Sequence, residues 1–210
     1  GHPELITPGV DAATGPLAQG LGMAVGMAMA EKHLSAEYNK PGLKIVDNRV
    51  YVIVGDGDLM EGLSHEAASL AGHLQLDNLT VLYDSNDVTL DADTNASVSD
   101  NVEKRFESYG WNYCKVEDGN DLQAIDNAIT IAKNVQHKPT LIEIKNTLGY
   151  GSPLAGNHKV HGNPLGLDGV ATTKRNLDWN HGPFEIPQKI YKRFEEIQKQ
   201  GQTSYLDWKD

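Results

Sequence analysis

Runs of β-branched and other apolar residues alternate along this chain with segments whose apolar residues recur at helical spacing. The runs are short, continuous and bounded by polar or glycine-containing breaks, which predicts buried strands. They lie at 50–54, 79–83, 111–116 and 139–145. The expected helices lie at about 16–36, 63–72, 102–109, 122–135 and 187–199. Because alternating strands and helices are typical of crossover units, we predict an α/β fold with a doubly wound, mainly parallel sheet flanked by helices.

After Asn146 the pattern changes to a long loop rich in Gly, Pro, His and Asn. Long loops in compact domains are usually functional or disordered. The helix expected after this loop carries Ile190, Phe194 and Ile197 on one face. Such an apolar stripe indicates a packing or docking surface rather than chemistry.

The charge and cysteine content exclude several classes of partner. The formal net charge is −11 over 210 residues, so neither nucleic acid nor an anionic membrane would attract the chain. No apolar segment is long enough to span a membrane. The single cysteine, Cys114, rules out an internal disulfide and suits the reducing cytoplasm. Cys114 lies in an expected strand, so a packed thiol is favoured over a nucleophile. We expect a cytoplasmic protein.

The segment Gly55-Asp56-Gly57 and the later Asn86 are the strongest candidates for chemistry. Each follows an expected strand, and parallel strands bring both to the edge of the sheet where open α/β sheets bind ligands. Carboxylate and amide oxygens suit Mg²⁺ or Ca²⁺, and glycines let the backbone approach a diphosphate closely. The alternative interpretation is an ordinary strand-to-helix turn in which Asp56 caps the helix.

Several segments rich in Gly, Asp and His occur in an order that resembles one protein family. They are Gly15-Pro16-Leu17-Ala18-Gln19-Gly20, Gly55-Asp56-Gly57-Asp58-Leu59-Met60-Glu61-Gly62, Tyr83-Asp84-Ser85-Asn86, Gly149-Tyr150-Gly151-Ser152 and His158-Lys159-Val160-His161-Gly162. Together they resemble the N-terminal thiamine diphosphate-binding domain of transketolase, up to about residue 167 and more loosely beyond it. The resemblance implies that 1–210 is a single diphosphate-binding (PP) domain, truncated at its N-terminal end. Its C-terminal loop and helix are then expected to lead toward a missing pyrimidine-binding domain.

The resemblance implies thiamine diphosphate as cofactor, held through Mg²⁺ or Ca²⁺. Asp56, Asn86 and the main-chain carbonyl of Val88 match the family's metal ligands, and Asn86 also belongs to the cofactor site. Gly57 matches a residue that contacts the diphosphate. Asp58, by resemblance, points away from the metal, and we expect it to be an exposed acid at the start of a helix.

The resemblance also implies residues that face the rest of the cofactor and the substrate. Gly15 and Leu17 are expected to meet the aminopyrimidine through backbone groups. His2 and His161 match histidines that face the donor sugar, and His161 also meets the cofactor. Glu61 matches a glutamate in a carboxylate network between the two active sites of a homodimer. The alternatives are a terminal residue for His2, a solvated loop for His161 and a first-turn helix acid for Glu61.

Transketolases transfer a two-carbon ketol unit from a ketose to an aldose, both sugar phosphates, in the pentose phosphate pathway. They build each cofactor site between the PP domain of one subunit and the pyrimidine-binding domain of the other. Because this chain carries only the PP part, we expect it to be inactive by itself.

Other functions stay open at this point. The chain also resembles the related thiamine diphosphate enzymes dihydroxyacetone synthase and deoxyxylulose phosphate synthase. The Gly-Pro-Leu and His-rich loop segments favour transketolase over the latter, but they do not separate it from dihydroxyacetone synthase. A non-catalytic module that keeps the fold without the activity is the remaining alternative.

Overall fold

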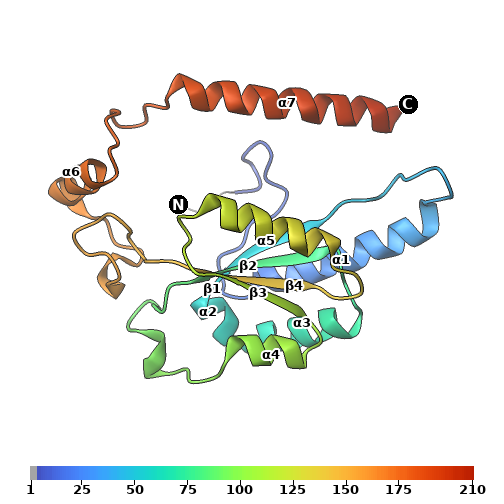
Figure 1. The fold of residues 1–210 in the computed structure, drawn as a ribbon, viewed down its shortest axis with the longest axis horizontal. Coiled ribbons are helices and arrows are strands. Elements are labelled where there is room, and N and C mark those ends of the chain that lie inside the picture. The colour runs from blue at the N-terminus through green and yellow to red at the C-terminus, as the bar shows by residue number, and fades with distance from the viewer. Residues whose placement is uncertain (1–3) are drawn as a thin grey trace. The chain divides into compact units, whose positions relative to one another are not determined.

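The computed structural model describes residues 4–210, and within them four parallel strands form one sheet in the order β1-β2-β4-β3 (Figure 1). The strands are β1 (Val50–Gly55), β2 (Leu79–Ser85), β3 (Asn112–Val116) and β4 (Thr140–Lys145). In the register of β1 and β2, Gly55 lies opposite Asp84, so the two strands end side by side. The parallel sheet predicted from the sequence is confirmed.

Seven helices occur in the described residues. They are α1 (Gln19–Tyr38), α2 (Asp56–Met60), α3 (Gly62–His73), α4 (Val102–Ser108), α5 (Leu122–Asn134), α6 (Gly166–Asn176) and α7 (Gln188–Lys209). Two single 3₁₀ turns, η1 (Thr94–Ala96) and η2 (His158–Val160), lie in the loops.

Helices cover both faces of the sheet, which makes the fold doubly wound. Figure 1 shows α3 and α4 on one face and α5 on the other. The neighbouring residues Leu141 and Ile142 of β4 are both fully buried, and they belong to the two different cores. This is expected of a strand whose side chains alternate between two covered faces.

The end of α4 packs directly against α3. A Cβ atom added to Gly72 of α3 would lie 1.8 Å from the carbonyl oxygen of Tyr109. The indole nitrogen of Trp111 donates a hydrogen bond to the carbonyl oxygen of Ala68, 2.8 Å away. The absent side chain at position 72 therefore sets how closely these two helices approach.

The edge strand β1 is less buried than its apolar sequence predicts. Val54 is 2% exposed and packs in the core formed with α1 and α3, whereas Ile53 is 75% exposed on the opposite face. The expectation of a strand buried throughout is therefore wrong at Ile53. The helix on that side, α5, packs over β3 and β4 rather than over β1.

The sequence pattern missed two helices and shortened a third. Helix α2 begins at Asp56 itself, and its five residues are too few to show a helical period. Helix α6 carries few apolar residues, which leaves no clear helical stripe in the long loop. Helix α7 continues to Lys209, beyond the predicted end near residue 199.

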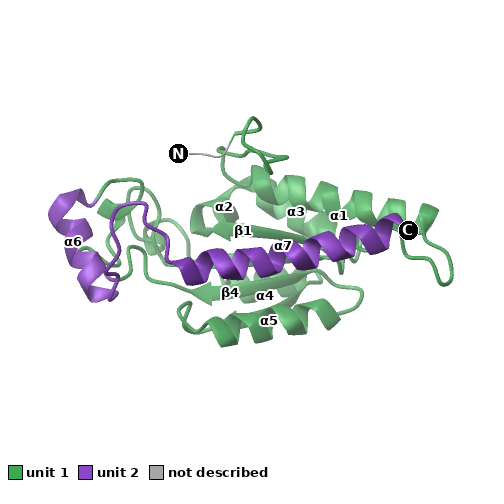
Figure 2. Ribbon diagram, turned by 90° about the horizontal axis from the view of Figure 1, so that it is seen from above, with its two compact units in different colours: residues 1–150, 154–164 green, residues 151–153, 165–210 purple. Residues whose placement is uncertain are grey.

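The chain divides into two compact units (Figure 2). Unit 1 holds 1–150 and 154–164, including the whole sheet, and unit 2 holds 151–153 and 165–210. Whether the chain counts as a single PP domain with a C-terminal extension stays a prediction.

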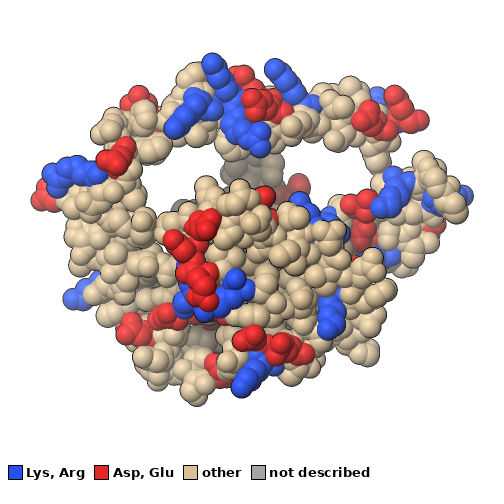
Figure 3. Space-filling model, viewed as in Figure 1, with Lys and Arg blue, Asp and Glu red and all other residues tan. Residues whose placement is uncertain are grey.

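Acidic and basic side chains are mixed on the surface. On the face shown in Figure 3, Asp and Glu lie among Lys and Arg rather than in one large patch. Within 4–210, none of the helices is both long enough and apolar enough to cross a membrane.

Candidate functional site

Asp56 and Asn86 meet at the edge of the sheet, as the sequence predicts. Asp56 follows β1 directly, and only 8% of its surface is exposed. One carboxylate oxygen accepts a hydrogen bond from the Tyr83 hydroxyl at 2.6 Å. The other accepts one from the backbone amide of Asn86 at 3.1 Å. The parallel pairing of β1 and β2 brings the three residues together.

A tight turn places Val88 beside Asn86. The side-chain oxygen of Asn86 accepts a hydrogen bond from the amide of Val88 at 3.1 Å, which is an Asx turn. Between them, Asp87 takes a left-handed conformation with φ 61°. The Val88 carbonyl therefore belongs to the same short turn that contacts Asp56, so the three predicted metal-binding positions lie together.

The donor set around Asp56 fits a hard divalent cation. Burial raises the pKa of the Asp56 carboxyl, while the hydrogen bonds from Tyr83 and Asn86 lower it. Both of these hydrogen-bond donors are neutral, so the buried negative charge is stabilised by dipoles and not by a contacting cation. One carboxylate, one amide oxygen and one main-chain carbonyl are ligands of the kind that Mg²⁺ and Ca²⁺ take. Among residues 4–210 no three His, Cys, Asp or Glu side chains cluster as a metal site.

The loop before α1 reaches the glycine turn. A Cβ atom added to Gly57 would lie 3.2 Å from Cδ1 of Leu17, so the Leu17 side chain already occupies the space beside this glycine. Leu17 remains 52% exposed, and Gly15 is exposed in the same loop. The structure thus brings Leu17, predicted to meet the aminopyrimidine, next to Gly57, predicted to meet the diphosphate.

Asp58 differs from its expected role. It is half-buried rather than exposed, and its two oxygens accept hydrogen bonds from the amides of Ala18 and Gly55, each at 2.8 Å. The expectation of an exposed helix-start acid is therefore wrong. The contact with Ala18 spans 40 positions of sequence, which a local pattern does not reveal.

The remaining predicted residues are Glu61, His161 and His2, of which the first two are exposed. Glu61 immediately precedes α3 with an exposed side chain that makes no capping hydrogen bond, a position that fits an acid at the helix start as well as the predicted network. His161 lies exposed just after η2, and its described hydrogen bonds are local, to His158 and Asn163. His2 lies outside the described residues. The roles given to these three residues stay predictions.

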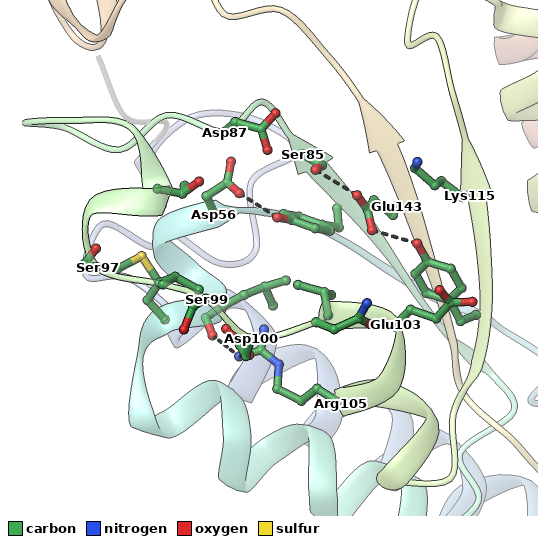
Figure 4. A pocket seen from close by; sticks show the side chains of 18 of the residues that line it. Asp56, Ser85, Asp87, Ser97, Ser99, Asp100, Glu103, Arg105, Lys115 and Glu143 are labelled. Atoms are coloured by element: carbon green, nitrogen blue, oxygen red, sulfur yellow. Dashed lines mark hydrogen bonds and ion pairs between the residues drawn. The ribbon is translucent and has the colours of Figure 1, made fainter.

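A pocket of about 780 Å³ opens beside Asp56. In Figure 4, Asp56, Ser85 and Glu143 lie on one side of it, and Asp100 and Arg105 on the other. Glu143 was not among the predicted site residues. A single acid within an otherwise apolar strand could have indicated that it faces a polar site. Its carboxylate accepts hydrogen bonds from the hydroxyls of Ser85 at 3.0 Å and Tyr113 at 2.7 Å.

Arg105 binds the loop that follows the Asn86 turn through Asp100. Its guanidinium forms an ion pair with Asp100 at 2.9 Å and donates to the carbonyl oxygen of Leu59 at 3.1 Å. Leu59 belongs to α2, the helix that begins at Asp56. Arg105 of α4 thereby connects the loop at Asp100 to α2 at Leu59. No local sequence pattern predicts this connection.

Comparisons with known proteins show the family. The sequence model of the family described as "Transketolase, thiamine diphosphate binding domain" matches residues 1–210. A transketolase of Streptococcus pyogenes is 50% identical over 212 residues, which cover 100% of this chain and 29% of that protein.

Solved structures give the same result. Transketolase from Leishmania mexicana matches with a TM-score of 0.95 at 38% identity, covering 98% of this chain and 31% of that one. A Pichia stipitis transketolase in complex with sedoheptulose 7-phosphate matches with a TM-score of 0.94 at 41% identity, covering 96% of this chain and 30% of that one. The chain therefore spans about a third of the length of these relatives. It belongs to the transketolase family, in which it matches the thiamine diphosphate-binding domain.

Proposed function

We propose that this chain forms the diphosphate-binding half of a transketolase active site. Within a full-length homodimer, that site transfers a two-carbon ketol unit from a ketose phosphate to an aldose phosphate in the cytoplasmic pentose phosphate pathway. Family membership supports the cofactor, and the sugar phosphate in the Pichia stipitis complex supports the substrate class.

One observation carries the proposal: Asp56 and Asn86 are in contact at the carboxyl edge of β1 and β2. The Asp56 carboxylate, the Asn86 side-chain oxygen and the Val88 carbonyl would hold Mg²⁺ or Ca²⁺, and the metal would bind the diphosphate. Gly57 has no side chain, so its backbone stays open to the diphosphate on the side that Leu17 leaves free.

The other site residues would orient the cofactor and move protons. Thiamine diphosphate supplies the nucleophilic carbon and the electron sink that ketol transfer needs. Gly15 and Leu17 would contact the aminopyrimidine, and Glu61 would join a carboxylate network with the second subunit. His2 and His161 would exchange protons with sugar hydroxyls, since imidazole titrates near neutral pH.

The proposal is tested by titration calorimetry of thiamine diphosphate with Mg²⁺ on the full-length protein that contains this sequence. Asp56→Asn keeps the shape of the side chain but removes its charge, and Asp56→Ala removes the ligand altogether. Both variants should lose affinity by several kcal/mol, because a charged metal ligand is lost. The matched control is Asp91→Ala, which removes an exposed acid from the loop after Asn86 and should leave the affinity unchanged.

Equal affinities for Asp56→Asn and Asp91→Ala would show that the Gly-Asp-Gly turn is only structural. The 210 residues alone should give no turnover with xylulose 5-phosphate and ribose 5-phosphate, since they match only the thiamine diphosphate-binding domain, 29% of the length of the Streptococcus pyogenes relative. Turnover near a typical enzyme rate of about 10 per second would contradict the two-domain site.

A further inference from the structure

Asp58 joins two segments that are far apart in sequence. One of its oxygens accepts the amide of Ala18, in the loop before α1, and the other accepts the amide of Gly55, at the end of β1. Both distances are 2.8 Å, within the normal range for N–H···O hydrogen bonds and typical of bonds in which a carboxylate accepts from an amide. A single carboxylate thus holds both segments.

The Ala18 end of this link is constrained. Ala18 is fully buried and takes a left-handed conformation with φ 65°, which is unfavourable for a residue with a Cβ atom. Its amide precedes the first turn of α1, where amides lack partners within the helix. The bond to Asp58 satisfies this buried amide and holds the backbone in the strained conformation.

The two segments that Asp58 joins also lie close together at Leu17 and Gly57. Leu17 packs over Gly57, so that a Cβ atom at position 57 would lie 3.2 Å from Cδ1 of Leu17. Under the proposed function, Leu17 faces the aminopyrimidine end of the cofactor and Gly57 faces the diphosphate end. The distance between the aminopyrimidine contact at Leu17 and the diphosphate contact at Gly57 depends on how Asp58 links the two segments.

We propose that Asp58 is a positioning residue that sets the distance between the aminopyrimidine-binding loop at 15–18 and the diphosphate-binding turn at 55–57. It contacts neither metal nor cofactor and acts through the amides of Ala18 and Gly55. The inference rests on the proposed function, because the two segments matter together only if one ligand spans them.

The test compares a ligand that spans both segments with one that occupies only the turn. Thiamine diphosphate and inorganic diphosphate, each with Mg²⁺, are titrated into the full-length protein and its Asp58→Asn and Asp58→Ala variants. Asp58→Asn keeps one acceptor oxygen and replaces the other with an NH₂ group that faces an amide. We expect the Kd of thiamine diphosphate to rise at least about tenfold in both variants, and that of inorganic diphosphate less than about threefold.

Asp121→Ala is the matched control. Asp121 also accepts a backbone amide, that of Ala124 at 2.9 Å, but only within the first turn of α5. This variant loses a helix cap without touching either segment, so both Kd values should stay within about twofold of the wild type.

A second measurement does not depend on ligand binding. Amide hydrogen exchange in the peptide that contains Ala18 should be faster in Asp58→Asn than in the wild type and Asp121→Ala, without cofactor. Equal weakening of both ligands, or unchanged exchange at Ala18, would show that Asp58 is only a cap of α2. If wild-type protein bound inorganic diphosphate but not thiamine diphosphate, the proposed function itself would fail, and this inference with it.

Discussion

The hydroxyl of Tyr83 donates a hydrogen bond to the carboxylate of Asp56, with 2.6 Å between the two oxygens. Tyr83 lies near the end of β2 and is 4% exposed, so the bond is shielded from water. Burial raises the pKa of Tyr83, and the hydroxyl therefore keeps its proton at neutral pH. Strand β2 thus fixes the orientation of a carboxylate carried by the neighbouring segment.

Tyr83→Phe should weaken cofactor binding without unfolding the protein. Loss of the hydroxyl leaves Asp56 with one of its two described hydrogen bonds, and we expect the affinity for thiamine diphosphate with Mg²⁺ to fall severalfold. The free energy of unfolding should fall by about 1–2 kcal/mol. Calorimetric titration and urea unfolding measure the two effects.

The control for this variant is Tyr113→Phe. Tyr113 loses a bond of the same kind, to Glu143 at 2.7 Å, but it does not contact Asp56. Its cost to stability should be similar and its effect on cofactor affinity negligible. A matching loss of affinity in both variants would mean that the Tyr83 hydroxyl has no specific role in orienting Asp56.

The sequence alone predicted the contacts that depend only on which strands are adjacent and parallel. Asp56 and Asn86 each follow an apolar run, and two adjacent parallel strands bring such positions together whatever the details of packing. The helical spacing placed α3 and α5 to within one residue at each end, but it predicted no helix at α6. Helix α2 escaped prediction because one turn of helix has too few residues to show a period.

Long-range polar contacts were beyond the sequence pattern. The bond from Ala18 to Asp58 and the reach of Arg105 to Leu59 join segments 40 and 46 positions apart. Neither leaves a local signature, since an aspartate at the start of a helix or an arginine within one is common on a surface. The exposure of Ile53 was missed for a related reason, because apolar content indicates a strand but not which helix covers each face.

Phe106→Ala should be the most destabilising of the substitutions considered. Phe106 is 1% exposed and packs edge-on against Trp111, with 5.1 Å between ring centroids. Truncation of a buried Phe leaves a cavity and typically costs about 3–5 kcal/mol. Phe184→Ala is the control, since Phe184 is fully exposed and its loss should change stability by less than about 0.5 kcal/mol. Urea unfolding of both variants measures the difference in stability. Similar midpoint urea concentrations for Phe106→Ala and Phe184→Ala would contradict the packing of Phe106 described here.

Asp77 should make the fold sensitive to acid. Partial burial would raise the pKa of Asp77, but hydrogen bonds from the Lys32 ammonium and the His137 amide hold it below its usual value. Because the folded pKa is depressed, the stabilisation is present above the unfolded pKa of about 3.9 and is lost as pH falls through the folded value. Asp77→Asn should therefore lower the free energy of unfolding by about 1–2 kcal/mol at pH 7, and the difference should shrink as the pH falls below about 4 toward the depressed folded pKa.

The control for the acid effect is Asp47→Asn. Asp47 pairs with Lys44 at 2.9 Å, but its side chain is 67% exposed. Exposed pairs contribute about 0–1 kcal/mol, so this variant should follow the wild type across the pH range. Unfolding curves collected from pH 2 to pH 7 test both expectations, and a difference between Asp77→Asn and the wild type that stayed constant down to pH 2 would exclude Asp77 as the titrating group.

Cys114 should react slowly with thiol reagents in the folded protein. It is partly buried against the core formed with α5, and burial raises the pKa of its thiol. The thiolate is the reactive form, so iodoacetamide should modify the folded chain more slowly at pH 7 than the chain unfolded in urea. The rate should rise as the pH approaches the raised pKa. Equal rates for the two states would mean that the thiol is neither shielded nor perturbed.

The contact between Gly72 and the Tyr109 carbonyl restricts how this sequence can diverge. Any replacement at position 72 brings a Cβ atom to 1.8 Å from that oxygen, so no small adjustment of a side chain accommodates it. A relative with another residue there must have inherited a compensating shift in the turn after α4. A substitution without that shift would leave the added Cβ atom overlapping the carbonyl oxygen of Tyr109. In a related sequence, the residue at position 72 therefore indicates whether α3 and the end of α4 can pack as closely as they do here.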